Sequence, residues 1–450
     1  MQIIRNAEEI AVKESIAARD FDVVWGQEQE KYADRKYGIA VDIGTTTVAL
    51  SVYQLQKRRL AGSLQERNRQ CLMGSDVIMR LMHCQQGKQE QLRQMVVGQL
   101  EDMAAKICEE ICSLEEIQKM TVVGNTAMCH IFAGKDTAGL AGSPFRPDYQ
   151  GAFCCKGSDV GFREMGHMDI YILPGIDAHV GADATAMITE LQLFDRDKMQ
   201  LAVDIGTNAE IALNCQGKIT VCSAPAGPAF EGMEISCGMR GIPGAIARVK
   251  LAPQTGNIVL DVIGQNQKPK GICGSGLIDA VAQLLQCGMI QPDGYLLTEQ
   301  EARQRGIPET FVKRLEKDRF VLYVGEDRKI SLTREDIRQF QLAKAAVQSG
   351  IKVLLSSQGI CLEELDEIWI AGMFGGHISK SNAVKTGLFP DVSPDKLKMA
   401  GNAAGRGAAL ALLSSRFCRQ AEQIARQAQH LELASNEVFR QEFLKAMELR

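Results

Sequence analysis

The chain has 450 residues, which is enough for two or three domains. Its 51 lysines and arginines against 55 aspartates and glutamates give a formal charge of −4, so a basic nucleic-acid surface is not expected. With 45% hydrophobic and 24% charged residues, the composition is that of an ordinary globular protein. No apolar stretch approaches about 18 residues and no secretory pattern opens the chain, so we expect a cytoplasmic protein without a membrane span.

The first segment, residues 1–37, is rich in glutamate, lysine and arginine, and we expect an N-terminal linker or a short helix there. It contains no cysteine, although the whole chain has 14. That share is too low for a disulfide scaffold. We therefore expect most cysteines to be small buried side chains in a reducing compartment.

The clearest feature of the sequence is a repeat. Residues 40–45 read AVDIGT, and the same six letters recur at 202–207. Each copy is an apolar strand that runs into a glycine turn, and an alternating pattern after the turn predicts a second strand. No helix follows either glycine directly, as a Rossmann or P-loop site would require. The repeat predicts two related lobes, 38–199 and 200–400, followed by C-terminal helices over 401–450.

The two turns have the residues of a phosphate and metal site. Gly44 and Gly206 let the backbone approach a ligand, and turn amides can donate to phosphate oxygens. Asp42 and Asp204 are the candidate catalytic carboxylates and would hold Mg²⁺ through water. Further candidate nucleotide ligands are the polar residues of the turns: Thr45, Thr46, Thr47, Thr207 and Asn208.

Other predicted elements follow the same plan. Small-residue helices are predicted at 181–191 and 401–413, and we expect such helices to pack closely. A strand at 119–124 precedes a helix, and a glycine turn at 271–276 precedes an apolar helix at 277–285. A buried strand from residue 367 runs into further glycines. Candidate nucleotide contacts in these turns are Gly274, Ser275, Gly372, Gly375 and Gly376.

The segment 223–246 is rich in glycine and proline and follows the second hairpin. Loops of this composition often carry function. We expect it to form part of the nucleotide cleft and a partner surface. Its candidate partner-facing residues are Ser223, Glu231, Ser236 and Arg240.

The cysteine spacings do not predict a metal cluster. Cys108 and Cys112 are expected on one face of a helix, where an apolar stripe favours the core. Cys154 and Cys155 are adjacent in a predicted glycine-rich loop. No C-x-x-C occurs, so an iron–sulfur or zinc site within the chain is not expected. His179, near Asp177 and Asp183, could position a water or a metal.

This ordered set resembles the superfamily of acetate kinase, sugar kinases, Hsp70 and actin. The similar parts are two phosphate turns (42–47 and 204–207), an adenosine motif (372–376) and two connecting helices (181–191 and 401–413). The resemblance implies an α/β fold of two ribonuclease-H-like lobes, an actin-like ATPase fold, with ATP and Mg²⁺ in the cleft between the lobes.

Longer strings resemble the ATPase part of the reductive activators of corrinoid proteins. They are TVVGNTAMCHIF (121–132), LPGIDAHVGADATAM (173–187), SAPAGPAFEGMEISCGMRGIPGAI (223–246), GICGSGLIDA (271–280), IAGMFGGHI (370–378) and the tail at 430–449. The resemblance implies an ATPase that drives a corrinoid protein from Co(II) to Co(I) in a methyltransferase system. Members of this family carry an N-terminal plant-type ferredoxin domain, whose cysteine spacing this sequence lacks. A separate ferredoxin-like iron–sulfur protein is therefore the expected electron donor.

Three alternatives stay open at this point. A dehydratase-type activator would share a 4Fe–4S cluster between two copies, with Cys129 and Cys154 or Cys155 as ligands. A small-molecule kinase would need a phosphoryl acceptor and a base facing it. A nucleotide-gated binding module would bind ATP without hydrolysing it. A homodimer is compatible with each of them.

Overall fold

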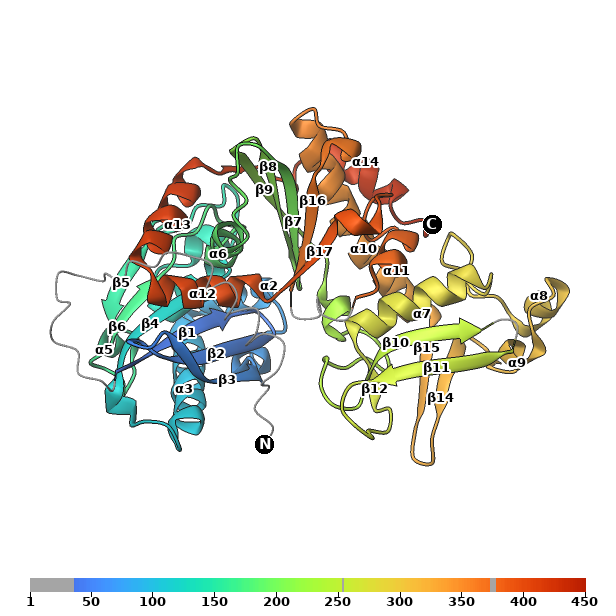
Figure 1. Cartoon of the computed structure of the whole chain (residues 1–450), viewed down its shortest axis with the longest axis horizontal. Helices are drawn as coiled ribbons and strands as arrows, with labels where there is room; N and C mark the ends of the chain where they lie inside the picture. Colours follow the sequence, from blue (N-terminus) through green and yellow to red (C-terminus); the bar gives the residue numbers. More distant parts are fainter. Residues whose placement is uncertain (1–35, 253–254, 373–377) are drawn as a thin grey trace. The chain divides into compact units, whose positions relative to one another are not determined.

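The computed structural model describes residues 36–252, 255–372 and 378–450 (Figure 1). The predicted linker at 1–37 therefore lies almost entirely outside the described residues. The chain forms two compact units. The first runs to Arg196 and includes Gln216–Val221 and Asn402–His430, whereas the second comprises Asp197–Cys215, Cys222–Gly401 and Leu431–Arg450. The C-terminal segment is thus divided between the units. The predicted boundaries at 200 and 401 stay predictions.

The first unit is built on a six-stranded sheet with the order β3-β2-β1-β4-β6-β5. The strands β1, β2 and β3 are antiparallel, β4 and β6 continue parallel to β1, and β5 is antiparallel to β6. Their apolar residues alternate with more exposed ones along β2, as expected for a sheet covered on one face. The bounds are β1 Tyr37–Ile43, β2 Thr47–Gln54, β3 Arg59–Arg67, β4 Ile117–Gly124, β5 Phe153–Lys156 and β6 Asp169–Ile172.

A second six-stranded sheet has the order β17-β16-β7-β8-β9-β18. Strands β7 and β8 are antiparallel, and β16 and β17 continue parallel to β7. Apart from its terminal strand, this order repeats that of the first sheet. The predicted pair of ribonuclease-H-like folds is therefore confirmed. The bounds are β7 Met199–Ile205, β8 Ala209–Cys215, β9 Lys218–Ala224, β16 Glu367–Ala371, β17 Leu397–Gly401 and β18 Gln429–His430.

The helices of the first unit include the two predicted small-residue helices, which pack against each other. They are α6 (Ala182–Glu190) and α12 (Ala403–Leu413). A Cβ added to Gly407 would lie 2.7 Å from the Cβ of Ala186, so glycine lets the backbones approach. The predicted close contact is confirmed. The other helices of this unit are η1 Arg69–Leu72, α2 Val77–His83, η2 Cys84–Lys88, α3 Gln89–Cys108, η3 Leu114–Glu116, α4 Thr126–Ala133, η4 Ala138–Leu140, α5 Gly157–Val160 and α13 Ser415–Gln427.

The second unit carries two small additional sheets, β11-β10-β12 and β13-β14-β15. Their strands are β10 Ala245–Ala252, β11 Asn257–Val262, β12 Gly271–Ile272, β13 Leu315–Glu316, β14 Arg319–Val324 and β15 Lys329–Thr333. The 24-residue helix α10 (Arg334–Ser357) contributes a buried face to the core of this unit. The remaining helices are η5 Pro228–Glu231, α7 Gly274–Gln286, α8 Glu299–Gln304, α9 Glu309–Val312, η6 Leu362–Glu364, α11 Lys380–Lys385, η8 Pro394–Lys396 and α14 Glu437–Lys445.

Two local predictions about cysteines were wrong. Helix α3 ends at Cys108, so Cys112 lies in the following turn and not one helical turn further along the same face. Cys154 and Cys155 lie in β5, where consecutive side chains point to opposite faces, and not in a loop. Cys108 is buried in the core, as the apolar stripe predicted.

Candidate nucleotide-binding site

The first AVDIGT copy forms the predicted strand–turn–strand. Strand β1 ends at Ile43 and β2 begins at Thr47, so three residues make the turn. A Cβ on Gly44 would lie 2.6 Å from the carbonyl oxygen of Thr47, which explains why glycine is required there. The hydroxyl of Thr45 accepts a hydrogen bond of 3.0 Å from the side-chain amide of Asn125, the residue that caps α4. The turn is therefore held from one side by the loop after β4.

Two carboxyl groups lie close together beside this turn. Asp42 is on β1, and Asp183 is in the first turn of α6. Burial raises the pKa of Asp42 to about 7, the neighbouring Asp183 raises it further, and a hydrogen bond from Asn402 lowers it. Burial raises the pKa of Asp183 to about 6, partly offset by backbone N–H donors, among them that of Ala184 at 2.8 Å. Both side chains keep some accessible surface.

This carboxyl pair fits a divalent cation. Two carboxylates that are costly to ionise together gain from a positive charge between them. Mg²⁺ prefers hard oxygen ligands, keeps several waters and takes one or two carboxylates from a protein. Asp42 and Asp183 supply such ligands. Over the described ranges, no group of three or more His, Cys, Asp or Glu side chains could hold a metal ion.

The second AVDIGT copy forms the same hairpin with different neighbours. The backbone N–H of Gly206 donates to the carbonyl oxygen of Asn208 at 3.0 Å and closes the turn between β7 and β8. The hydroxyl of Thr207 donates to a carboxylate oxygen of Glu231 at 2.9 Å. On the sheet, Asp204 pairs with Glu210 of β8. Glu231, predicted to face a partner, thus lies at the turn itself.

The predicted adenosine motif begins next to this second turn. Gly372 follows β16 with φ of 107°, a value that favours glycine. A Cβ there would lie 2.6 Å from the carbonyl oxygen of Ile205 and 3.1 Å from a carboxylate oxygen of Asp204. The structure thus brings Gly372 and Asp204 together. Gly375 and Gly376, and with them His377, lie outside the described residues.

The predicted contacts at the start of α7 are used for packing. A Cβ on Gly274 would lie 2.1 Å from the carbonyl oxygen of Phe230, so the helix lies directly against η5. Ser275 is buried, and its hydroxyl lies 3.3 Å from the thiol of Cys273. Contact of Gly274 and Ser275 with a nucleotide stays a prediction.

The segment 223–246 is tied down by its polar residues. Ser236 donates from its backbone N–H and its hydroxyl to the two carboxylate oxygens of Asp336, both at 2.7 Å, at the start of α10. The hydroxyl of Ser223 donates to Glu210 at 3.4 Å. Arg240 is half-buried. Whether these side chains face a partner stays a prediction.

The sequence analysis missed several polar residues around the first turn. Asn125 and Asn402 were not assigned a role, and Asp183 was considered only as a neighbour of His179. All three stand at or near a helix start: Asn125 and Asn402 cap α4 and α12, and Asp183 lies in the first turn of α6. A capping residue directly after a glycine-rich strand end is the signal that could have found the asparagines. Asp177 is hydrogen-bonded to His430 at 2.7 Å.

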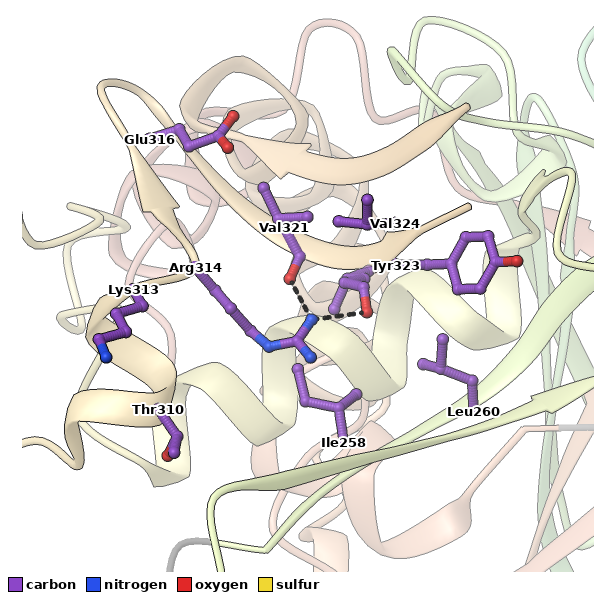
Figure 2. Close-up of a pocket in the computed structure, with 10 residues that line it drawn as sticks. Ile258, Leu260, Thr310, Lys313, Arg314, Glu316, Val321, Tyr323 and Val324 are labelled. Carbon is purple, nitrogen blue, oxygen red and sulfur yellow. Dashed lines mark hydrogen bonds between the residues drawn. The ribbon is translucent and has the colours of Figure 1, made fainter. Parts of the chain in front are cut away.

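A hollow of about 450 Å³ lies elsewhere in the second unit (Figure 2). Its lining comes from β11, α9 and β14, and none of the predicted site residues is among the ones that line it. The guanidinium of Arg314 donates to the carbonyl oxygens of Val321 and Leu322, both at 3.2 Å, where the pairing of β14 with β15 shifts register. Arg314 therefore satisfies backbone acceptors at an irregularity of the strand.

The thiols and helices add two general findings. All 14 cysteines are free, seven half-buried or exposed beside seven in the interior or nearly so. Along the part of the chain that the structure describes, no helix combines the length and the apolar character needed to cross a membrane.

Comparison with known proteins identifies the family. A model described as the C-terminal, ASKHA domain of RACo matches residues 198–450, and one described as the RACo middle region matches 37–196. The corrinoid activation enzyme RamQ of Eubacterium limosum is 33% identical over 430 residues, covering 94% of this chain and 71% of that protein. The Co(II) methylated amine-specific corrinoid protein reductase of Methanosarcina barkeri is 26% identical, covering 91% and 76%.

A solved structure leads to the same family. The reductive activator for corrinoid, iron–sulfur protein is 32% identical, with a TM-score of 0.85, and the match covers 93% of this chain and 67% of that one. The predicted resemblance and the predicted fold class are thereby confirmed. The chain belongs to the RACo family of ASKHA-domain corrinoid activators.

Proposed function

We propose that this chain uses ATP hydrolysis to drive reduction of the cobalt in a corrinoid protein from Co(II) to Co(I). The observation that carries the proposal is the match to a corrinoid activation enzyme along 94% of the chain. The second relative is named as a reductase of a Co(II) corrinoid protein, and the solved relative as a reductive activator. Three matches to one activity support the same activity here.

The two AVDIGT turns supply the nucleotide chemistry in this proposal. The turn amides, with Thr45, Thr46, Thr47, Thr207 and Asn208, bind phosphate oxygens, and Gly372 with the glycines after it contacts the adenosine. Asp42 and Asp204 hold Mg²⁺ through water and are the candidate catalytic residues. Asp183, which lies beside Asp42, joins them because its carboxyl shares the same buried surroundings. When bound, Mg²⁺ neutralises charge on the transferring phosphoryl group.

The reduction itself requires one electron from outside the corrinoid protein. We propose a separate ferredoxin-like iron–sulfur protein as the donor, since these 450 residues contain no plant-type cluster spacing. ATP shifts the equilibrium toward a state in which the bound corrinoid accepts the electron. A cytoplasmic location and a homodimer complete the proposal, and molar-mass measurement in solution tests the dimer.

The test uses the purified full chain under anaerobic conditions. A methylated amine-specific corrinoid protein in the Co(II) state is mixed with the chain and a reduced low-potential ferredoxin, and visible absorbance follows Co(I). We expect Co(I) to form with ATP and not with ADP, and ATP hydrolysis to accompany it. Formation of Co(I) at the same rate without ATP would contradict the proposal.

The same preparation separates the alternatives. A dehydratase-type activator would contain stoichiometric iron in a dimer, with brown colour. A small-molecule kinase would transfer the γ-phosphate to an acceptor other than water. A nucleotide-gated module would bind ATP tightly and hydrolyse almost none of it. Each of these outcomes replaces the proposed function with another.

A further inference from the structure

A fully buried arginine lies beside the first phosphate turn. Arg80 is on α2 and exposes none of its surface. Arginine is rarely buried so completely, and where it is, its donors need partners. The partners of Arg80 therefore indicate what the side chain does.

The guanidinium of Arg80 joins three parts of the structure. One terminal nitrogen donates to the carbonyl oxygen of Thr45 in the turn. The other terminal nitrogen donates to the side-chain oxygen of Gln70 at 3.2 Å, and Nε donates to the carbonyl oxygen of Gly74 at 3.0 Å. Only a planar fork can reach acceptors in these different directions at once.

Asn68, on the same segment, binds the neighbouring carbonyls of the turn. Its side-chain amide donates to the carbonyl oxygen of Gly44 at 2.8 Å, and its backbone N–H donates to that of Thr46 at 2.8 Å. Asn68 and Arg80 thus hold three consecutive carbonyl groups, those of Gly44, Thr45 and Thr46. All three therefore turn toward the segment 68–80.

The direction of these carbonyls fixes the direction of the turn amides. In a trans peptide, the C=O of one residue and the N–H of the next point to opposite sides. With the carbonyls of Gly44 and Thr45 held on one side, the N–H groups of Thr45 and Thr46 point away from Arg80. Successive N–H groups aimed to one side form a concave site for an anion.

We propose that Arg80, together with Asn68, is a positioning residue that presets the first turn for the phosphates of ATP. This inference rests on the proposed function and names how its first phosphate turn is built. Arg80 contacts the turn from behind, through carbonyl groups, and acts on phosphate only through the amides of Thr45 and Thr46.

The test compares Arg80→Lys with Arg69→Lys in the full chain. Lysine keeps the positive charge of Arg80 but cannot serve all three acceptors. Arg69 lies on the same segment, with a half-exposed side chain paired to Asp102, and receives the same chemical change. Affinities for a non-hydrolysable ATP analogue and for adenosine are measured for each variant by calorimetry and competition.

We expect Arg80→Lys to weaken binding of the ATP analogue by about 10- to 100-fold while adenosine binding changes less than about twofold. General loss of structure would weaken both ligands together. Arg69→Lys should alter neither. A ratio of the two affinities equal to that of the parent chain overturns the inference.

A measurement on the unchanged chain covers the case in which the variant does not fold. The ATP analogue should slow hydrogen exchange of the amides of segment 44–47, and adenosine should not. Unchanged exchange of these amides on binding the analogue overturns the inference. If the parent chain binds no ATP at all, the proposed function fails. If it hydrolyses ATP but Arg80→Lys behaves like the parent, only the role of Arg80 fails.

Discussion

The two AVDIGT turns occupy equivalent places in two sheets of the same strand order, yet different side chains surround them. Around the first turn lie the carboxyl of Asp183, the amides of Asn125 and Asn402 and the buried guanidinium of Arg80. The second turn is bonded to a carboxylate, that of Glu231. The repeated six residues therefore determine the backbone, and their surroundings determine the chemistry.

The surroundings differ because the chain between repeated strands differs. In the first unit, the segment between β3 and β4 supplies Asn68 and Arg80, which bind the turn. In the second unit, the chain after β9 supplies Glu231 and then two additional small sheets. One turn is thus enclosed by donors and the other faces an acceptor. We infer that the two halves of the repeat contribute unequally to ATP hydrolysis.

The largest expected effect tests whether Asp204 shares the role of Asp42. Replacing Asp204 by Asn removes a charge proposed to hold the hydrated Mg²⁺, so we expect the ATPase rate constant to fall at least about 100-fold. Steady-state ATPase assays measure it. Asp261→Asn, at an exposed position of β11, is the matched control and should stay within about twofold of the parent.

Near-normal turnover by Asp204→Asn would contradict the assignment of the second turn. It would also show that the sequence repeat preserves the fold without preserving the role of the aspartate. A fall as large as that of Asp42→Asn would instead make the two turns equal partners despite their different neighbours.

Much of the fold was legible in the sequence because it depends on local patterns. The repeat at 40–45 and 202–207 predicted two strand–turn–strand units, and both are present. The small-residue helices also formed where expected, since alanine and glycine fit a close helix pair. The order of motifs then indicated the superfamily, which the family match confirmed.

The details of the site were less legible because they depend on contacts between distant residues. Arg80 lies 35 positions from Thr45, and Asn402 reaches Asp42 from the far end of the chain. No local pattern distinguishes such residues from ordinary surface polar residues. Cys112 shows the converse error: a helical spacing was assumed beyond Cys108, where α3 in fact ends.

A second prediction concerns the helix pair of the first unit. Helix α12 follows the last strand of the second sheet but belongs to the first unit, where it packs on α6. Gly407→Ala would place a Cβ 2.7 Å from both the Cβ and the carbonyl oxygen of Ala186. We expect it to destabilise the protein by about 3 kcal/mol, because packed backbones would have to separate.

The control for Gly407→Ala is Gly98→Ala on α3, where an added Cβ meets no heavy atom within 4 Å. Alanine favours a helix, so this control should stabilise by up to about 1 kcal/mol. Urea unfolding followed by circular dichroism gives both values. Equal effects of the two substitutions would show that the α6–α12 contact does not require glycine.

The smallest predicted effect concerns the acidity around the first turn. Because burial raises the pKa of Asp42 to about 7, the folded state binds this proton more tightly than the unfolded chain, whose aspartate titrates near about 4. The stability that the protonated carboxyl contributes is full below about pH 4 and is lost as pH rises through about 7. Asparagine cannot ionise, so Asp42→Asn should escape that loss.

We therefore expect Asp42→Asn to be more stable than the parent by about 2 kcal/mol at pH 8, with the difference fading toward pH 4, although the variant hydrolyses little ATP. Urea unfolding at both pH values, in chelator to remove divalent cations, measures it, with Asp261→Asn as the matched exposed control. A variant less stable than the parent at pH 8 would mean that the carboxylate of Asp42 is stabilised by its neighbours. The first turn would then carry no stored electrostatic cost for Mg²⁺ to relieve, and its difference from the second turn would rest on the clamp of Asn68 and Arg80 alone.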